Sequence, residues 1–171
     1  MKIIFLDIDG VLNSEKSAEY YCEEYGATVF NQNIKKDAPT IQEVRWGAWN
    51  VFFLRKIIKE TGAKVVLSST WRTRYDIATF GKFFALYDFS DIEIIGITPK
   101  LPHRERGNEI AQFLDNFQYQ SRFSDEITQY VILDDDNDML ESQKDYFVQT
   151  DFDFGLTEKD ALKAIKILNN N

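Results

Sequence analysis

The sequence predicts an α/β fold with a doubly wound parallel sheet and helices on both of its faces. Short apolar runs of strand length alternate along the chain with segments of helical periodicity, and strands that are joined through helices run parallel. Three of these apolar runs end directly in polar clusters, at Asp7 and Asp9, at residues 68–72 and at residues 134–138. Ligands of such sheets bind at the carboxyl ends of the strands, so we expect the function to reside there.

The first apolar run, residues 3–6, predicts a strand that is buried on both faces and ends at Asp7. Side chains two positions apart on an extended chain point the same way, so Asp7 and Asp9 should both face outward past the strand end while Ile8 stays in the core. Gly10 permits a sharp turn after them. Two carboxylates this close repel each other, and a hard divalent cation such as Mg²⁺ would keep both ionised. A solvated turn after an edge strand is the alternative.

Residues 14–46 interrupt the alternation with a polar, tyrosine-rich segment of poor periodicity. We interpret this segment as a small cap-like insertion over Asp7, with one short helix near residues 17–25. The length of 171 residues suits a single domain with one well-buried core. The predicted organisation is therefore one domain over residues 1–171 that carries the insertion.

The chain after the insertion returns to a regular pattern. Apolar residues recur at helical spacing from Trp49, and the run closes at Gly62, a residue type that is common just past a helix end. Residues 63–67 then predict a second buried strand, and Ser68 to Arg72 follow at its end.

The middle of the chain contains two more helices and a third strand. Residues 76–87 predict a helix, and residues 92–97 predict the strand. Residues 98–107 form a basic, proline-containing loop, which is unusual in an acidic chain. The helix predicted over residues 108–117 places four apolar side chains on one face: Ile110, Phe113, Leu114 and Phe117.

The last part of the chain completes the sheet. Residues 130–133 predict a fourth buried strand that runs directly into the acidic residues from Asp134. Residues 146–150 predict a short fifth strand, and residues 157–168 predict a closing helix with Thr157 as its N-cap.

Composition narrows the classes of function. Hydrophobic residues make up 44% of the chain and aromatic residues 15%, which argues against disorder. A formal net charge of −8 opposes indiscriminate binding to nucleic acid without excluding a local basic groove. The single cysteine, Cys22, cannot form an internal disulfide, and no apolar run approaches the roughly 20 residues that cross a bilayer. We therefore expect no membrane partner and a cytoplasmic location.

The polar clusters resemble the four motifs of the haloacid dehalogenase (HAD) superfamily of phosphohydrolases. They appear in family order: Asp7 to Val11, then Ser68 after the second strand, a basic residue before a helix, and Asp134-Asp135 after the fourth strand. The resemblance implies a Rossmann-like, three-layer α/β/α fold. Further segments resemble the branch found in RNA repair proteins and phage polynucleotide kinase-phosphatases: residues 67–72, 106–110, 133–139, 148–151 and 155–157.

This resemblance implies roles for four carboxylates. Asp7 would be the nucleophile that forms an aspartyl-phosphate, a reaction that a metal assists by screening its charge from that of the phosphate. Asp9 would protonate the leaving oxygen, later deprotonate the attacking water, and bind the metal through its backbone carbonyl. Asp134 and Asp135 would complete the Mg²⁺ site. A solvated acidic turn is the alternative, although the repulsion of consecutive acids calls for a counter-ion.

Binding of the phosphoryl group is expected from hydroxyls after the second strand. We favour Ser68 as the donor because it is the first residue past the strand, with Ser69 and Thr70 as the other candidates. All three also suit a turn or a helix cap. Trp71 could stack on a base, but packing beneath the insertion is favoured.

The resemblance also implies a cation as the third motif, commonly lysine in the superfamily. The best match here is Arg106 at a helix start, with Arg104 and Lys100 as rivals. Arg72 would add a second phosphate contact through its planar guanidinium or form an ordinary surface ion pair.

The predicted function is that of a Mg²⁺-dependent phosphomonoesterase. A phosphorylated nucleic-acid end or a nucleotide fits the branch resemblance and the basic loop, and a separate kinase or ligase is a candidate partner. A small metabolite phosphate instead fits the net charge and the modest insertion. A non-catalytic phosphoacceptor or metal-binding module remains the alternative outside the enzymes.

Overall fold

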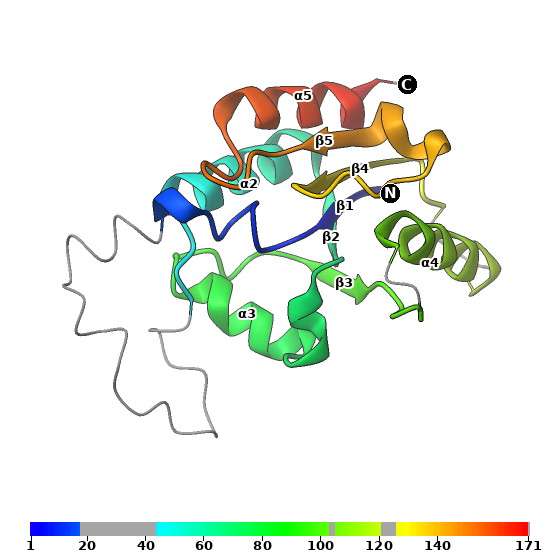
Figure 1. The fold of residues 1–171 in the computed structure, drawn as a ribbon, viewed down its shortest axis with the longest axis horizontal. Helices are drawn as coiled ribbons and strands as arrows, with labels where there is room; N and C mark the ends of the chain where they lie inside the picture. The colour runs from blue at the N-terminus through cyan, green and yellow to red at the C-terminus, as the bar shows by residue number, and fades with distance from the viewer. Residues whose placement is uncertain (18–43, 103–104, 121–125, 171) are drawn as a thin grey trace.

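A five-stranded parallel sheet forms the centre of the molecule, with the strand order β3-β2-β1-β4-β5 (Figure 1). The structure is a computed structural model that describes residues 1–17, 44–102, 105–120 and 126–170. The strands, in chain order, are β1 (Lys2–Leu6), β2 (Lys64–Leu67), β3 (Ile94–Ile97), β4 (Gln129–Asp134) and β5 (Phe147–Gln149). The chain therefore builds the sheet outward from β1 on one side through β2 and β3, and then on the other through β4 and β5. This reversal creates a topological switch point between β1 and β4, where ligands of such sheets bind.

The register of the three central strands aligns their polar ends. Leu6 of β1 pairs with Leu67 of β2 and with Leu133 of β4. The next residues, Asp7, Ser68 and Asp134, consequently stand at the same level of the sheet edge.

Side chains of β1 alternate between two hydrophobic cores, as the period of two on a strand requires. Ile4 and Leu6 join the larger core, which α2 (Ala48–Thr61), α3 (Ile77–Ala85) and α5 (Glu158–Asn169) complete. Ile3 and Phe5 face the smaller core, where α4 (Arg106–Gln120) contributes Ile110. Both faces of the sheet are covered, and the three-layer prediction is confirmed.

Local signals account for the helix ends. α2 ends at Gly62, whose φ of 68° lies in the left-handed region that glycine adopts without strain. The Asp76 side chain caps α3, and Thr157 with Asp160 forms a capping box at the start of α5. Two short 3₁₀ helices, η3 (Thr70–Thr73) and η4 (Glu141–Tyr146), follow β2 and precede β5.

The strands and helices predicted outside residues 14–46 are all present, with shifted bounds. The largest shift is in α4, which begins at Arg106 rather than at residue 108 and continues to Gln120. Most of the predicted insertion, including most of its expected short helix, lies outside the described residues, and the cap remains a prediction. Its two ends meet: the Ser17 hydroxyl donates to the Arg45 carbonyl at 3.1 Å. No described helix has the length and apolar character needed to cross a membrane.

Candidate active site

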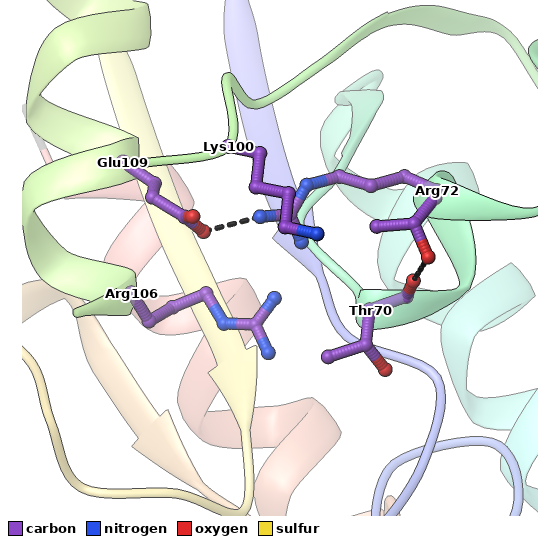
Figure 2. A pocket seen from close by; sticks show the side chains of 6 residues that line it. Thr70, Arg72, Lys100, Arg106 and Glu109 are labelled. Carbon is purple, nitrogen blue, oxygen red and sulfur yellow. Dashed lines mark hydrogen bonds and ion pairs between the residues drawn. The ribbon is translucent and has the colours of Figure 1, made fainter. Parts of the chain in front are cut away.

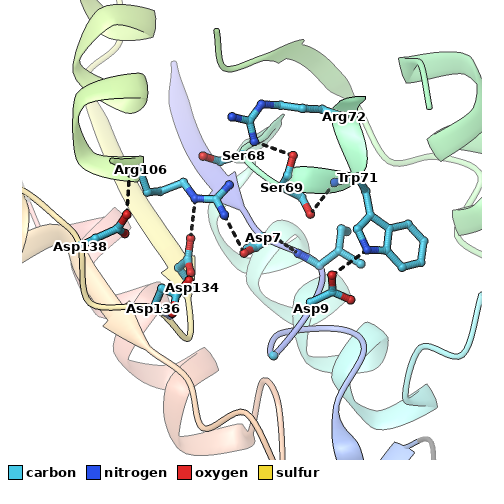
Figure 3. Close-up of polar contacts among 12 residues, drawn as sticks. Asp7, Asp9, Ser68, Ser69, Trp71, Arg72, Arg106, Asp134, Asp136 and Asp138 are labelled. Atoms are coloured by element: carbon cyan, nitrogen blue, oxygen red, sulfur yellow. Dashed lines mark hydrogen bonds and ion pairs between the residues drawn. The ribbon is translucent and has the colours of Figure 1, made fainter. Parts of the chain in front are cut away.

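The turn after β1 places two carboxylates at the switch point (Figure 3). The Asp7 N–H donates to the Leu133 carbonyl at 3.0 Å, so its backbone still follows the sheet, and Asp7 is 5% exposed. Ile8 is fully buried, as predicted, and separates Asp7 from the partly exposed Asp9. The Ile8 N–H donates to Asp7 Oδ1 at 2.7 Å and fixes the orientation of that carboxylate.

Three carboxylates from the ends of β1 and β4 gather at one point. Ligand-type oxygens of Asp7, Asp134 and Asp135 all lie within 4.8 Å of one another. Gly10 makes this approach possible, because a Cβ at its position would lie 2.2 Å from the Asp135 Cγ and its φ is 69°. The absence of a side chain at Gly10 is thus a steric requirement of the acidic cluster.

Arg106, the first residue of α4, points into this cluster. Its Nη2 lies 3.0 Å from Asp7 Oδ2, and its Nε lies 3.2 Å from Asp134 Oδ2. Asp138 fixes the start of the helix by accepting a hydrogen bond from the Arg106 N–H at 2.9 Å. Burial opposes the charged guanidinium, but Asp7 and Asp134 together raise the pKa of Arg106 above its ordinary value.

Burial changes the pKa values of the acids. It raises the pKa of Asp7, although Arg106 and hydrogen bonds from the Ser69 hydroxyl and the Ile8 N–H act in the opposite direction. Burial, reinforced by the charge of Asp7, raises the pKa of Asp134 to about 8. Burial also raises the pKa of Asp135. One arginine therefore does not fully compensate three acids, and the site favours an additional cation.

The donor set fits Mg²⁺. The cluster offers carboxylate oxygens alone, which suits a hard ion. The buried Asp134 Oδ2 lies within ion-pair distance of Arg106 yet has no hydrogen-bond partner among the described residues. Asp7, Asp134 and Asp135 are therefore able to hold the metal, with the Asp9 backbone carbonyl as the fourth predicted ligand.

The two serines after β2 occupy different positions. Ser68 follows Leu67 in the strand register, its N–H donates to the Leu6 carbonyl at 2.8 Å, and its hydroxyl lies 3.4 Å from that of Thr98. The Ser69 side chain instead acts to lower the pKa of Asp7, and its hydroxyl accepts from the Trp71 N–H at 3.3 Å. The structure thus places Ser68 level with Asp7 and Ser69 at the start of η3, and the choice between them as phosphate donor remains a prediction.

A second arginine lines a pocket beside the acidic cluster (Figure 2). Arg72 forms an ion pair with Glu109 of α4, and both side chains are nearly inaccessible to solvent. The expectation of an ordinary surface ion pair at Arg72 is therefore wrong, because the pair lies buried between η3 and α4. The pocket, about 130 Å³ in volume, is lined by Thr70, Arg72, Thr73, Lys100, Arg106 and Glu109.

Comparison with known protein families matches residues 3–161 to the HAD domain in Swiss Army Knife RNA repair proteins. The chain belongs to this HAD family. Comparisons with curated proteins and with solved structures found no match. The all-parallel sheet agrees with the Rossmann-like HAD fold, and membership supports a phosphatase of the HAD type in general. HAD domains typically use Mg²⁺, in agreement with the buried acidic cluster.

Three contributors to this HAD site were missed by the sequence-based reasoning. Glu109 clamps Arg72, and Asn13 and Trp71 both donate to Asp9. The spacing of Glu109, one helical turn after Arg106, was an available signal for a shared face. Arg104 lies outside the described residues, so its predicted role in binding phosphate remains a prediction.

Proposed function

We propose that this HAD domain is a Mg²⁺-dependent phosphomonoesterase that acts through an aspartyl-phosphate on Asp7. The observation that carries the proposal is the position of Asp7, a buried carboxylate at the switch point whose two oxygens are held by the Ile8 N–H and by Arg106. Such fixed donors orient a nucleophile without reorganisation during the reaction.

The reaction proceeds in two displacements at phosphorus. An oxygen of Asp7 attacks phosphorus and the ester P–O bond breaks, while Asp9 gives a proton to the leaving oxygen. Asp9 then takes a proton from a water molecule, which attacks phosphorus, breaks the bond to Asp7 and releases inorganic phosphate. Asp7, Asp134, Asp135 and the Asp9 carbonyl would hold Mg²⁺, which would neutralise charge between the attacking carboxylate and the phosphate.

The arginines supply the remaining positive charge. Arg106 Nη1 and Arg72 Nε are buried N–H groups without a hydrogen-bond partner among the described residues. Phosphoryl oxygens are suitable acceptors for both, and planar guanidinium groups bind phosphate through paired hydrogen bonds. Ser68 or Ser69 would donate to a further phosphoryl oxygen.

For the substrate, we propose a phosphorylated nucleic-acid end or a nucleotide. The matched family occurs in RNA repair proteins, and the pocket beside Asp7 carries Arg72, Lys100 and Arg106. A small metabolite phosphate is the alternative, because the net charge is −8. Added salt separates these outcomes: apparent affinity for a polynucleotide falls steeply with salt, and affinity for a small monoester changes little.

The test is phosphate release, with and without Mg²⁺, from 4-nitrophenyl phosphate, nucleotides, and oligonucleotides phosphorylated at the 3′ or the 5′ end. We expect Mg²⁺-dependent release that Asp7→Asn abolishes while the fold persists. Asp136→Asn is the matched control, because Asp136 is an exposed acid in the turn after β4, next to the metal-compatible cluster but outside it. Activity retained in Asp7→Asn would contradict the mechanism. A long-lived phosphoprotein without turnover would instead indicate a phosphoacceptor module.

A further inference from the structure

Asp9 is held by two neutral hydrogen-bond donors from different parts of the chain. The indole Nε1 of Trp71 donates to Asp9 Oδ2 at 2.8 Å (Figure 3). The Asn13 side-chain amide donates to Asp9 Oδ1 at 2.8 Å. Each carboxylate oxygen has about two lone-pair sites, so these two contacts leave one site on each oxygen able to carry a proton. The contacts therefore fix the plane of the carboxylate without consuming its capacity as an acid or a base.

The Trp71 indole is itself held in place. Its ring packs against three aromatic rings, with centroid distances of 6.4 Å to Trp46, 6.2 Å to Phe83 and 5.8 Å to Tyr75. Its backbone N–H donates to the Ser69 hydroxyl at 3.3 Å, and Ser69 thereby caps η3. Both the ring and the backbone of Trp71 are thus fixed.

Asn13 provides the second donor from a turn that is already closed by its backbone. The Asn13 N–H donates to the Ile8 carbonyl at 2.9 Å, and its carbonyl accepts from the Gly10 N–H at 2.7 Å. The side chain is therefore available for Asp9 without being needed to close the turn.

We propose that Trp71 and Asn13 are positioning residues that orient Asp9 for transfer of a proton to the leaving oxygen. The proposal rests on the proposed phosphatase function and assigns Trp71 a role beyond packing. A general acid must meet the leaving oxygen at hydrogen-bond distance in the transition state, and misplacement by about 1 Å from a remote change can cost about 100-fold in rate.

The leaving group separates positioning from packing. An alkyl phosphate expels an alkoxide that needs a proton, whereas 4-nitrophenyl phosphate expels a stable phenolate that does not. The ratio of kcat/KM for these substrates reports proton donation, because kcat/KM covers the first phosphoryl transfer whichever step limits kcat. As the alkyl phosphate we choose the nucleotide or end-phosphorylated oligonucleotide that the wild-type protein hydrolyses best in the phosphate-release test described above.

Trp71→Phe keeps an aromatic ring in the cluster and removes the N–H. We expect its kcat/KM to fall about 10- to 100-fold for the alkyl phosphate and less than about threefold for 4-nitrophenyl phosphate. Asp9→Asn should show the same selectivity with a larger loss. Trp49→Phe is the matched control, because it makes the same change at an exposed ring of α2 that packs against Phe52 and Phe53, and it should leave the substrate ratio unchanged.

Equal losses for both substrates in Trp71→Phe, or no loss, would overturn the positioning role. If that variant does not fold, Asn13→Ala carries the test on the other oxygen of Asp9. Failure of the two proposals can be distinguished. Activity retained in Asp7→Asn removes both, whereas selective loss of the alkyl phosphate in Asp9→Asn without such loss in Trp71→Phe leaves the phosphatase intact and removes only the role of Trp71.

Discussion

Arg106 and Arg72 line the same pocket, but their electrostatic surroundings are opposite. Arg106 lies among Asp7 and Asp134, which raise its pKa against the effect of burial. Burial lowers the pKa of Arg72, and the nearby Arg106 adds to this effect, while Glu109 only partly restores it. Among the described residues, the acidic side of the site therefore carries too little positive charge, and the side at Arg72 carries too little negative charge. A phosphomonoester together with Mg²⁺ would satisfy both sides at once.

The largest expected effect comes from removing the arginine that contacts the nucleophile. We expect Arg106→Met to lower kcat/KM by about 10²- to 10³-fold, as loss of one preorganised donor to a developing anion does. Arg72→Met should act more through KM, because its guanidinium lies beside the nucleophile's cluster rather than in it. Steady-state kinetics of both variants at saturating Mg²⁺ check this difference. Identical effects on kcat and KM in the two variants would remove the distinction between the arginines.

Glu109→Gln tests the side of the pocket at Arg72. The substitution leaves a buried arginine without its counter-ion, so we expect the free energy of unfolding to fall by about 3 kcal/mol. Inorganic phosphate should raise the Tm of this variant more than that of the wild type, because the anion supplies the missing charge. Glu105→Gln is the control, since Glu105 is exposed near the start of the same helix. Equal phosphate shifts in Glu109→Gln and the wild type would contradict this interpretation of the pocket.

The pH dependence of stability tests the acidic side in protein stripped of metal by a chelator. The pKa of Asp134 is raised by burial to about 8 in the folded state, above its ordinary value of 3.8. The folded state thus binds this proton more tightly than the unfolded state does. Protonation of Asp134 therefore adds to the free energy of unfolding, and this contribution is fully present below about pH 4 and is lost as the pH rises toward 8. We expect the Tm to fall over this range, and Asp134→Asn to flatten the profile. Mg²⁺ should raise the Tm more at pH 8 than at pH 5, because the metal needs the ionised carboxylate. A wild-type profile as flat as that of the variant would contradict the prediction.

The sequence predicted the acidic side of the site far better than the side at Arg72. Asp7, Asp9, Asp134 and Asp135 follow apolar strands directly, and strand periodicity with parallel topology is enough to bring such residues to one edge. Arg106 was recognisable because a basic residue at a helix start fits the third motif. These contacts depend on where strands end, which is a local property.

The contacts that were missed depend on how helices pack across the sheet edge. The Arg72–Glu109 pair joins η3 to α4, and the Trp71–Asp9 hydrogen bond joins η3 to the turn after β1. Helix or strand periodicity in the sequence does not reveal either pair, because the two partners lie in different segments. Their distance depends on how the connections between the strands pack against the sheet. The same limit applies to Ser68 and Ser69. The sequence pattern places both at the end of β2 but does not show which hydroxyl is the phosphate donor.

The smallest expected effect concerns Lys100, the exposed cation at the rim of the pocket. An exposed lysine contributes about 0.2–1 kcal/mol to a charge pair, so Lys100→Ala should raise KM by at most about fivefold and leave kcat unchanged. The effect should vanish at high salt if Lys100 acts on the phosphate from a distance through solvent. It should also be larger for an oligonucleotide than for 4-nitrophenyl phosphate, because a polynucleotide brings further phosphates to the rim. Measuring KM for both substrates at low and high salt decides this. An equal effect on both substrates would mean that Lys100 acts only on the phosphate that is cleaved. Substrate recognition would then rest on Arg106 and Arg72 alone among the cations that line the pocket.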